Sequence, residues 1–252
     1  MKNHLKEAEV ELHKKLADKY KGIRWKNKNS TYYNTLWIKN LLDIKFKFNS
    51  VLDYGCGTGS LYPFLKQKFN GAKYTGIDIS PDMLKVAKES YPDGKFIEAD
   101  GENLPFKNKT FDLVIVRGAL HHLPNPEKGL KEISRVLKPK GFLIASEPSA
   151  NFITSLMRRL VPHRHEHFSD VHKEFYVNEF NRILIKNNLK PLNVKYWGYL
   201  AYPFAFPDII PQFSKLPFSI FKVLVNIDKL MKETPILNKL SWGITVTAKK
   251  SS

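Results

Sequence analysis

Three glycines stand at alternate positions in the stretch VLDYGCGTGSL, residues 51–61, directly behind a short apolar run. Gly55, Gly57 and Gly59 accept backbone angles that other residues avoid, and they let a ligand approach the main chain closely. The spacing differs from the G-x-G-x-x-G fingerprint of dinucleotide-binding folds, because Ser60 stands at the sixth position. By itself the stretch is compatible with another ligand site, with a dinucleotide site or with a plain turn.

Two acidic residues follow at the ends of the next two predicted strands. Asp78 ends the stretch KYTGID, and Asp100 lies in ADGENLPF. A carboxylate at the first place can accept hydrogen bonds from both hydroxyls of a ribose. At the second place it can accept from an exocyclic amino group such as adenine N6. Either acid alone is also typical of an ordinary strand end. Because neighbouring parallel strands end at one edge of a sheet, the combination predicts a nucleoside site.

The elements that must position these residues alternate between strand and helix. Ser80 followed by Pro81 is a typical helix start. The continuous apolar run FDLVIV predicts a strand buried on both faces. Strands are expected at 50–54, 73–78, 95–98, 111–116 and 142–146, and helices at 59–69, 81–90 and 126–137. This order predicts an α/β fold in which helices cover a parallel sheet.

The flanking regions follow a different pattern. A helix is expected at 5–20, and Ser30 or Thr31 is the expected cap of a second helix. Beyond residue 150, a helix is expected at 177–188 and strands at 192–199 and 242–248. The segment between them, 200–240, is rich in proline and aromatic residues. Within it a helical stripe is typical of a helix that packs on a core, and it consists of Ile220, Val223, Leu224, Ile227, Leu230 and Met231.

Composition narrows the class of protein. The chain has 252 residues, 42% of them hydrophobic, which suits one large domain or a domain with a cap. A single cysteine, Cys56, forms no internal disulfide and is expected to be a packing residue in a reducing compartment. The N-terminus has no apolar leader, and no stretch is apolar enough for a membrane span, so a cytoplasmic location is expected.

The chain is also strongly basic, with a net charge of +17 that lies mostly outside residues 51–150. A basic surface can attract nucleic acid, anionic lipid headgroups or acidic metabolites. A lysine-rich, solvated surface without such a partner is the alternative.

Five successive motifs, VLDYGCGTG, YTGIDIS, ADGENLPF, FDLVIVRGALHHLPNP and EISRVLKPKGFLIASEP, resemble those of class I S-adenosylmethionine-dependent methyltransferases. They are most similar to the methyltransferase type 11 branch, which includes ubiquinone/menaquinone-biosynthesis enzymes. The resemblance covers about residues 50–148 and implies a Rossmann-like, seven-stranded sheet with an antiparallel last strand, for which WGITVTA is the candidate. The expected division is an N-terminal helical segment (1–48), the cofactor-binding domain (49–199 and 241–252) and a substrate cover (200–240).

The resemblance also implies cofactor-binding roles. Asp53 would orient the turn and the methionine amino group, Gly55 and Gly57 would allow backbone approach, and Asp78 would hold the ribose. Ile79 would pack on the adenine and Asp100 would bind its N6, with Gly101 and Glu102 beside it. S-adenosylhomocysteine would be the product.

The backbone at Arg117 and Gly118 would face the methionine end. Arg117 stands where the family often has a small residue. It would therefore either pair with a carboxylate of cofactor or substrate, or point away from the site.

Histidines supply the candidate acid–base chemistry. His121 and His122 follow the fourth predicted strand, beside the expected methyl end, and either could act as general base for a hydroxyl or an acidic carbon. The alternative is that one packs in the core and the other caps a loop. A second group, His163, His165, His167 and His172, suits a metal site, a wall of the substrate site or a solvated linker. It completes no familiar zinc pattern, so no metal is predicted.

The expected function is methyl transfer to a hydrophobic small molecule, lipid-like or aromatic, drawn from solution or a membrane surface. The stretch 196–221 carries nine aromatic residues and suits such a substrate. The alternatives are a tRNA or RNA methyltransferase that uses the basic flanks, and a non-catalytic cofactor-binding module that supports a partner enzyme. The sequence leaves the oligomeric state open.

Overall fold

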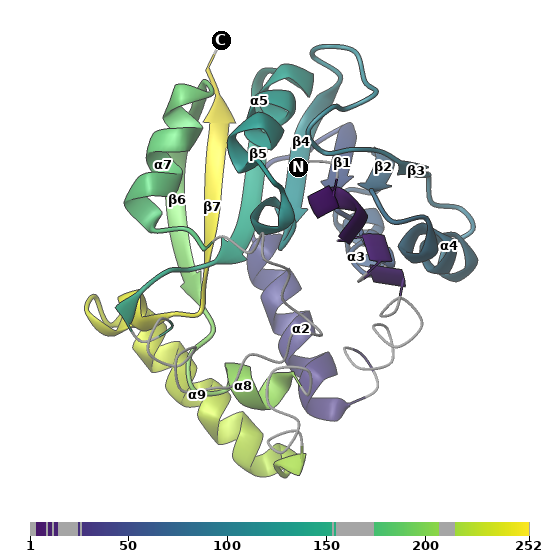
Figure 1. Ribbon diagram of the computed structural model, residues 1–252. Coiled ribbons are helices and arrows are strands. Elements are labelled where there is room, and N and C mark those ends of the chain that lie inside the picture. Colours follow the sequence, from purple (N-terminus) through teal and green to yellow (C-terminus); the bar gives the residue numbers. More distant parts are fainter. Residues whose placement is uncertain are drawn as a thin grey trace.

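The computed structural model describes residues 4–8, 10–11, 13–14, 25, 27–152, 154, 174–206 and 215–251. Its centre is a seven-stranded sheet in the order β3-β2-β1-β4-β5-β7-β6 (Figure 1). The strands are β1 Ser50–Tyr54, β2 Lys73–Asp78, β3 Phe96–Glu98, β4 Phe111–Arg117, β5 Leu137–Pro148, β6 Leu189–Trp197 and β7 Gly243–Lys250. The first five pair in parallel, and β7 runs antiparallel to β5 and β6. The expected sheet is confirmed.

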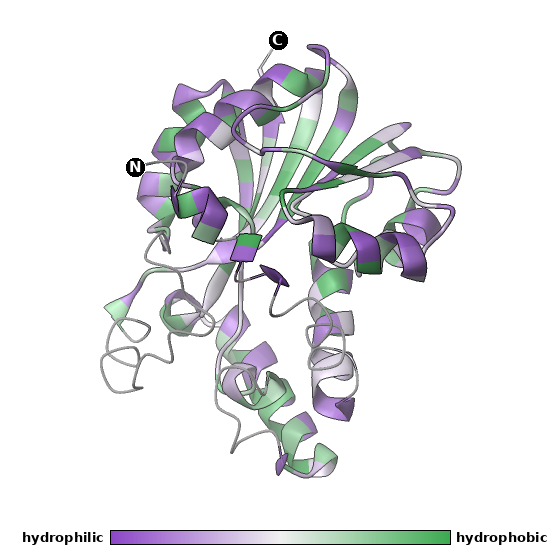
Figure 2. Cartoon of the chain, turned by 45° about the vertical axis from the view of Figure 1, so that its right-hand side comes forward, coloured by the Kyte–Doolittle hydropathy of each residue, from purple (hydrophilic) through white to green (hydrophobic). Residues whose placement is uncertain are grey.

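Helices cover both faces of the sheet. On one face lie α5 Pro126–Val136 and α7 Val177–Lys186, and on the other lie α2 Lys28–Leu41, α3 Tyr62–Lys68 and α4 Pro81–Ser90. In β4, Val114 and Val116 pack toward α5 and α7, whereas Leu113 and Ile115 pack toward α2 and α3. Burial on both faces explains the unbroken apolar run, and the central strands carry mainly hydrophobic colours in Figure 2.

Several element boundaries differ from those expected. The Asn27 side chain, which accepts from the amide of Asn29, caps α2, so this helix begins before Ser30. Ser30 is instead buried, and its hydroxyl donates to the carbonyl of Ala205 at 2.5 Å. Helix α3 begins only at Tyr62, because the glycine turn continues through Gly59 with positive φ. The predicted cap of α4 is confirmed, since Ser80 Oγ accepts from the amide of Met83.

The described parts of the segment between β6 and β7, residues 198–206 and 215–242, fold against α2. They contain α8 Tyr202–Ala205, α9 Phe218–Glu233 and the 3-10 helix η3 Leu237–Leu240. The ring of Tyr33, on α2, lies 5.9 Å from that of Phe206 and 6.2 Å from that of Phe221. These contacts form an apolar cluster separate from the three that pack against the sheet.

The stripe predicted to face the core is oriented differently. Ile220, Val223, Ile227 and Leu230 are exposed, whereas Phe221, Val225 and Asp228 form the buried face of α9. The prediction was wrong because α9 has two apolar faces. Helical periodicity identified the broader apolar face, which is exposed. The narrower face, which carries the Phe221 ring, packs on α2.

The N-terminal residues are helical wherever the structure describes them between 4 and 14. Drawn in purple in Figure 1, they lie beside the sheet, where Lys6 reaches the loop after β3. Among the described residues, no helix has the length and apolarity needed to cross a membrane.

Candidate cofactor and active site

All three glycines of the turn after β1 adopt positive φ: +69° at Gly55, +52° at Gly57 and +72° at Gly59. A Cβ on Gly55 would lie 2.3 Å from the Ala119 side chain, so this glycine permits close packing. A Cβ on Gly57 would meet no atom within 4 Å. The backbone at Gly57 therefore faces open space, as a turn that admits a ligand requires.

Asp78 connects this turn to the end of β2. One carboxylate oxygen accepts from the Gly57 amide at 2.8 Å, and the other accepts from the Ser80 amide at 3.0 Å. Each oxygen retains lone-pair capacity for a further donor. The predicted juxtaposition of glycine turn and acid is therefore present, and ribose binding by Asp78 stays a prediction. Ile79, expected to pack on the adenine, is half-buried beside it.

Asp53 is buried beneath the turn. It accepts a hydrogen bond from the Tyr74 hydroxyl at 2.9 Å. Burial raises the pKa of the Asp53 carboxyl to about 6, while the Tyr74 hydrogen bond and the charge of Arg117 act in the opposite direction. The structure thus gives Asp53 a partner within the sheet, and its contact with the methionine amino group stays a prediction.

Asp100 and Glu102 lie in the loop after β3 and share a cation from the N-terminal helix. The Lys6 ammonium lies 2.7 Å from Asp100 Oδ2 and 3.0 Å from Glu102 Oε2. The other Asp100 oxygen accepts from the Glu102 amide. Between the two acids, a Cβ on Gly101 would lie 2.1 Å from the Tyr54 hydroxyl, so a side chain there would clash. No motif in the sequence predicts this role of Lys6.

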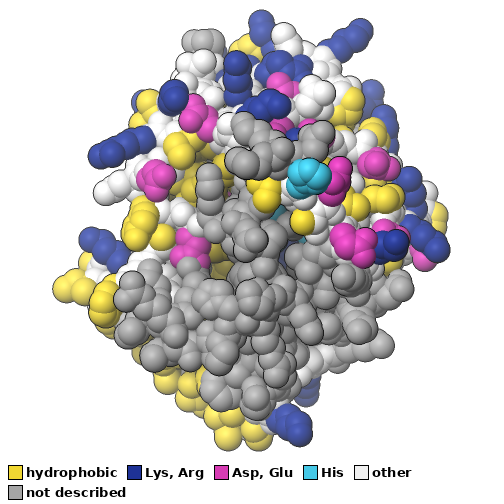
Figure 3. Space-filling view, in the orientation of Figure 1, with side chains coloured by type: hydrophobic (Ala, Val, Ile, Leu, Met, Phe, Trp, Pro, Cys, Tyr) yellow, Lys and Arg dark blue, Asp and Glu magenta, His cyan; other side chains and the backbone are white. Residues whose placement is uncertain are grey.

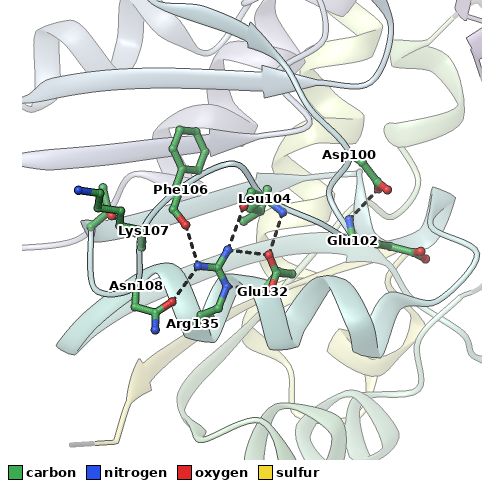
Figure 4. Close-up of polar contacts among 9 residues, drawn as sticks. Asp100, Glu102, Leu104, Phe106, Lys107, Asn108, Glu132 and Arg135 are labelled. Atoms are coloured by element: carbon green, nitrogen blue, oxygen red, sulfur yellow. Dashed lines mark hydrogen bonds and ion pairs between the residues drawn. The ribbon is translucent and has the colours of Figure 1, made fainter.

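An arginine–glutamate pair, Arg135 with Glu132, holds this loop to α5 (Figure 4). The Arg135 guanidinium donates to the carbonyls of Leu104 and Phe106 and to the Asn108 side chain. It also donates to Glu132, whose carboxylate accepts from the Leu104 amide at 2.8 Å. These contacts fix the residues that follow Asp100 and Glu102. Arg135 and Glu132 carry no cofactor-binding pattern in the sequence and were missed.

Arg117, at the end of β4, points toward the glycine turn and an aromatic group. Its Nη2 donates to Ser60 Oγ at 2.7 Å, and its guanidinium lies 5.2 Å from the centre of the Trp37 ring. Trp37 packs against Trp197 with ring centres 4.2 Å apart and planes tilted by 32°. Tyr202 and Trp242 continue this row of rings, and we call Trp37, Trp197, Tyr202 and Trp242 the aromatic wall. Arg117 therefore lies between the turn and the wall.

His121 forms a buried pair with a carboxylate at the end of β5. Its Nδ1 lies 2.6 Å from Glu147 Oε2, and Glu147 also accepts from the amides of Ala119 and Leu120. Burial raises the pKa of Glu147 to about 7, against the lowering effect of these amides. The His122 ring lies 4.0 Å from that of His121. Glu147 was missed, although an acid inside the apolar run FLIASEP was an available signal.

Comparison with known families identifies the central part of the chain. Residues 52–145 match the family described as the methyltransferase domain, a range that begins in β1 and ends in β5. The chain contains a class I S-adenosylmethionine-dependent methyltransferase domain. The strand order and antiparallel β7 agree with this assignment.

Two curated relatives of this methyltransferase domain are themselves named as methyltransferases. Demethylmenaquinone methyltransferase of Thermotoga maritima is 33% identical over 145 residues, which cover 56% of this chain and 62% of that protein. Phthiotriol/phenolphthiotriol dimycocerosates methyltransferase of Mycobacterium leprae is 34% identical over 110 residues, 43% of this chain and 41% of that protein. The chain thus spans less than two thirds of the length of these relatives.

Solved structures confirm the fold over nearly the whole chain. A chain from the Haloferax volcanii complex between the Trm112 methyltransferase activator and a methyltransferase gives a TM-score of 0.68. The similarity covers 95% of this chain and 98% of that chain, at 17% identity. It therefore extends beyond the methyltransferase domain into the flanking helices.

S-adenosylmethionine is the cofactor of this family of domains. The residues present fit it, because Gly57 faces open space and Asp78 keeps acceptor capacity beside it. Asp53, Asp78 and Asp100 would hold the amino acid, the ribose and the adenine respectively. Within the described part of the chain, no three His, Cys, Asp or Glu side chains form a group that could hold a metal ion. The run from His163 to His172 lies outside the described residues.

Proposed function

We propose that this chain transfers the methyl group of S-adenosylmethionine to a hydrophobic small molecule, either lipid-like or aromatic. The position of Arg117 carries the proposal, because this residue contacts both Ser60 of the glycine turn and Trp37 of the aromatic wall. An acceptor that packs on the wall would therefore lie beside the methionine end of the cofactor site. The names of the two curated relatives, which refer to a quinone and to lipids, support the same substrate class.

In this mechanism the protein chiefly orients the methyl donor and the acceptor, and it excludes water from the site. The bound cofactor supplies a methyl group that is already activated on a sulfonium. Asp78 and the Gly57 backbone fix the donor, while Trp37 and Trp197 offer an apolar surface to the acceptor. Orientation of two reactants can supply about 7–11 kcal/mol of barrier reduction in favourable cases.

The His121–Glu147 pair provides a general base when the acceptor is a hydroxyl or an acidic carbon. If Nδ1 carries the proton donated to Glu147, Nε2 of the same ring is the nitrogen that accepts a proton from the acceptor. The ring lies next to the end of β4, since a Cβ on Gly118 would be 3.5 Å from His121 Cε1. Glu147 is thus a positioning residue for His121.

The test is incubation of the full chain with methyl-labelled S-adenosylmethionine and a cell extract that is then separated into lipid, aqueous small-molecule, RNA and protein fractions. We expect label in the lipid or small-molecule fraction. The Trp197→Ala variant should lose this labelling yet bind S-adenosylhomocysteine as the wild type does. Label in RNA would favour the RNA methyltransferase instead. Cofactor binding without label in any fraction would favour the non-catalytic module.

A further inference from the structure

Helix α9 carries an exposed apolar face on the outside of the cover. Val223 is 57% exposed and Leu230 is 67% exposed. Ile220, one turn before Val223, and Ile227, between Val223 and Leu230, are exposed as well. After the helix, Ile236 is 78% exposed and extends the same region. Figure 3 shows hydrophobic side chains gathered along the lower left edge of the molecule, over α9. We call Ile220, Val223, Ile227, Leu230 and Ile236 the α9 face.

Among the described residues 215–241, most of the charged side chains around the α9 face are lysines. Lys215, Lys222, Lys229 and Lys239 are exposed, and Lys232 is half-buried. Between residues 215 and 241 the acids are Glu233 and Asp228, and Asp228 is buried against the loop before α8. Phe218 packs beneath Lys222 and Lys28, with ammonium-to-ring distances of 5.3 Å and 4.5 Å. An apolar face bordered by lysines is typical of a helix that lies in the headgroup region of a membrane.

We propose that the α9 face docks on an anionic lipid surface. Apolar side chains would enter the boundary between headgroups and acyl chains, and the lysines would contact lipid phosphates. A second copy of the chain suits the face less well. In a two-fold dimer each face meets itself, so the lysines would oppose lysines with Glu233 as the exposed acid nearby.

Docking through α9 would bring the substrate cover to the source of a lipid-like acceptor. Helix α9 packs through Phe221 on Tyr33 of α2, and α2 also carries Trp37 of the aromatic wall. The proposed membrane face and the proposed acceptor surface are therefore linked by one helix. This link rests on the proposed function, whereas docking itself follows from the face and its charges.

The test is sedimentation of the full chain with vesicles of phosphatidylcholine alone or mixed with phosphatidylglycerol. We expect binding to the mixed vesicles that weakens with salt. Each lysine near an anionic surface contributes about 1 kcal/mol, or about fivefold in affinity, so Lys222→Glu with Lys229→Glu should weaken binding at least tenfold. Val223→Ser with Leu230→Ser should have an effect of similar size, because two apolar side chains no longer enter the lipid.

Matched controls use exposed residues on other elements. Ile185→Ser, on α7, removes a side chain that is 62% exposed, and Lys131→Glu with Lys190→Glu removes charges on α5 and β6. Both should leave vesicle binding nearly unchanged, and all variants should bind S-adenosylhomocysteine normally. Equal binding to both vesicle types, or equal loss in the controls, would overturn the proposal. So would a wild-type dimer that the α9 variants dissociate. Vesicle binding without methylation would remove only the proposed function.

Discussion

The Lys6 ammonium lies 2.7 Å from the Asp100 carboxylate and 3.0 Å from that of Glu102, although 94 residues separate Lys6 from Asp100. Asp100 is the residue expected to accept a hydrogen bond from the adenine amino group. Lys6 and the adenine amino group would both donate to this carboxylate, and we predict that they compete for it. If this prediction holds, the N-terminal helix and the cofactor are coupled through Asp100.

Replacement of Lys6 by methionine should strengthen S-adenosylhomocysteine binding about two- to fivefold. The Asp100 side chain is 34% exposed, and partly exposed ion pairs contribute at most about 1 kcal/mol. Isothermal titration calorimetry measures the change, with Lys131→Met on α5 as the control. Weaker binding by the Lys6 variant would show that this lysine supports the bound state instead.

The Gly57→Ala variant should lose at least tenfold in cofactor affinity. Gly71 offers a matched control, because it also has positive φ, +83°, and a Cβ there also meets no atom within 4 Å. Both substitutions strain the backbone by about 1–2 kcal/mol. Only the methyl group at position 57 would enter the proposed cofactor space. Equal affinity of the two variants would contradict the placement of the cofactor beside Gly57.

Removal of the Arg135 side chain should weaken both the fold and the cofactor site. The Arg135→Ala variant leaves the carbonyls of Leu104 and Phe106 without this donor, which costs about 1–3 kcal/mol of unfolding free energy. We also expect about tenfold weaker cofactor binding, since the loop carrying Asp100 loosens. Urea unfolding and calorimetry measure the two effects. Arg182→Ala, at an exposed position of α7, should change neither.

Glu147→Gln should reverse the tautomer of His121 and slow turnover about a hundredfold. The glutamine oxygen can still accept from the Ala119 and Leu120 amides, so its NH₂ group would face His121 Nδ1. The ring proton then moves to Nε2, which can no longer act as a base. Nitrogen NMR of His121 should show this move, while the affinity for S-adenosylhomocysteine stays constant. An unchanged turnover number would remove His121 from the mechanism.

Asp228→Asn should become progressively more stable, relative to the wild type, as pH rises. Burial raises the pKa of Asp228 from 3.8 to about 6. The stability it contributes is therefore fully present below its unfolded pKa and is lost as pH rises through about 6. Asparagine takes up no proton in this range. Thermal unfolding of both proteins at several pH values between about 4 and 7 measures the difference in their unfolding free energies. A difference that stays constant over this range would contradict the raised pKa of Asp228.

Much of the fold could be predicted because its signals are local. Ser80 and Pro81 mark the start of α4, and the run FDLVIV marks a strand buried on both faces. The glycine turn and Asp78 were predicted to meet because parallel strands end at one edge. The same reasoning left out Lys6, Arg135 and Glu147, since an ion pair or hydrogen bond between distant segments leaves no periodicity in the sequence. It also assigned the wrong face of α9 to the core, because two apolar faces give the same local pattern.

Helix α2 packs in two apolar clusters at once. Ile38 and Leu41 belong to the cluster that α2 and α3 form with the sheet. Tyr33 belongs to the cluster that α2 forms with α8 and α9. Loss of either cluster would expose apolar surface on the same helix. Detachment of α8 and α9 and opening of the sheet are therefore coupled in free energy. Backbone amides of α9 should therefore exchange with deuterium at rates that follow those of α2. Helices α8 and α9 would then form one cooperative unit with α2. A substitution at Tyr33 would accelerate exchange in both α2 and α9.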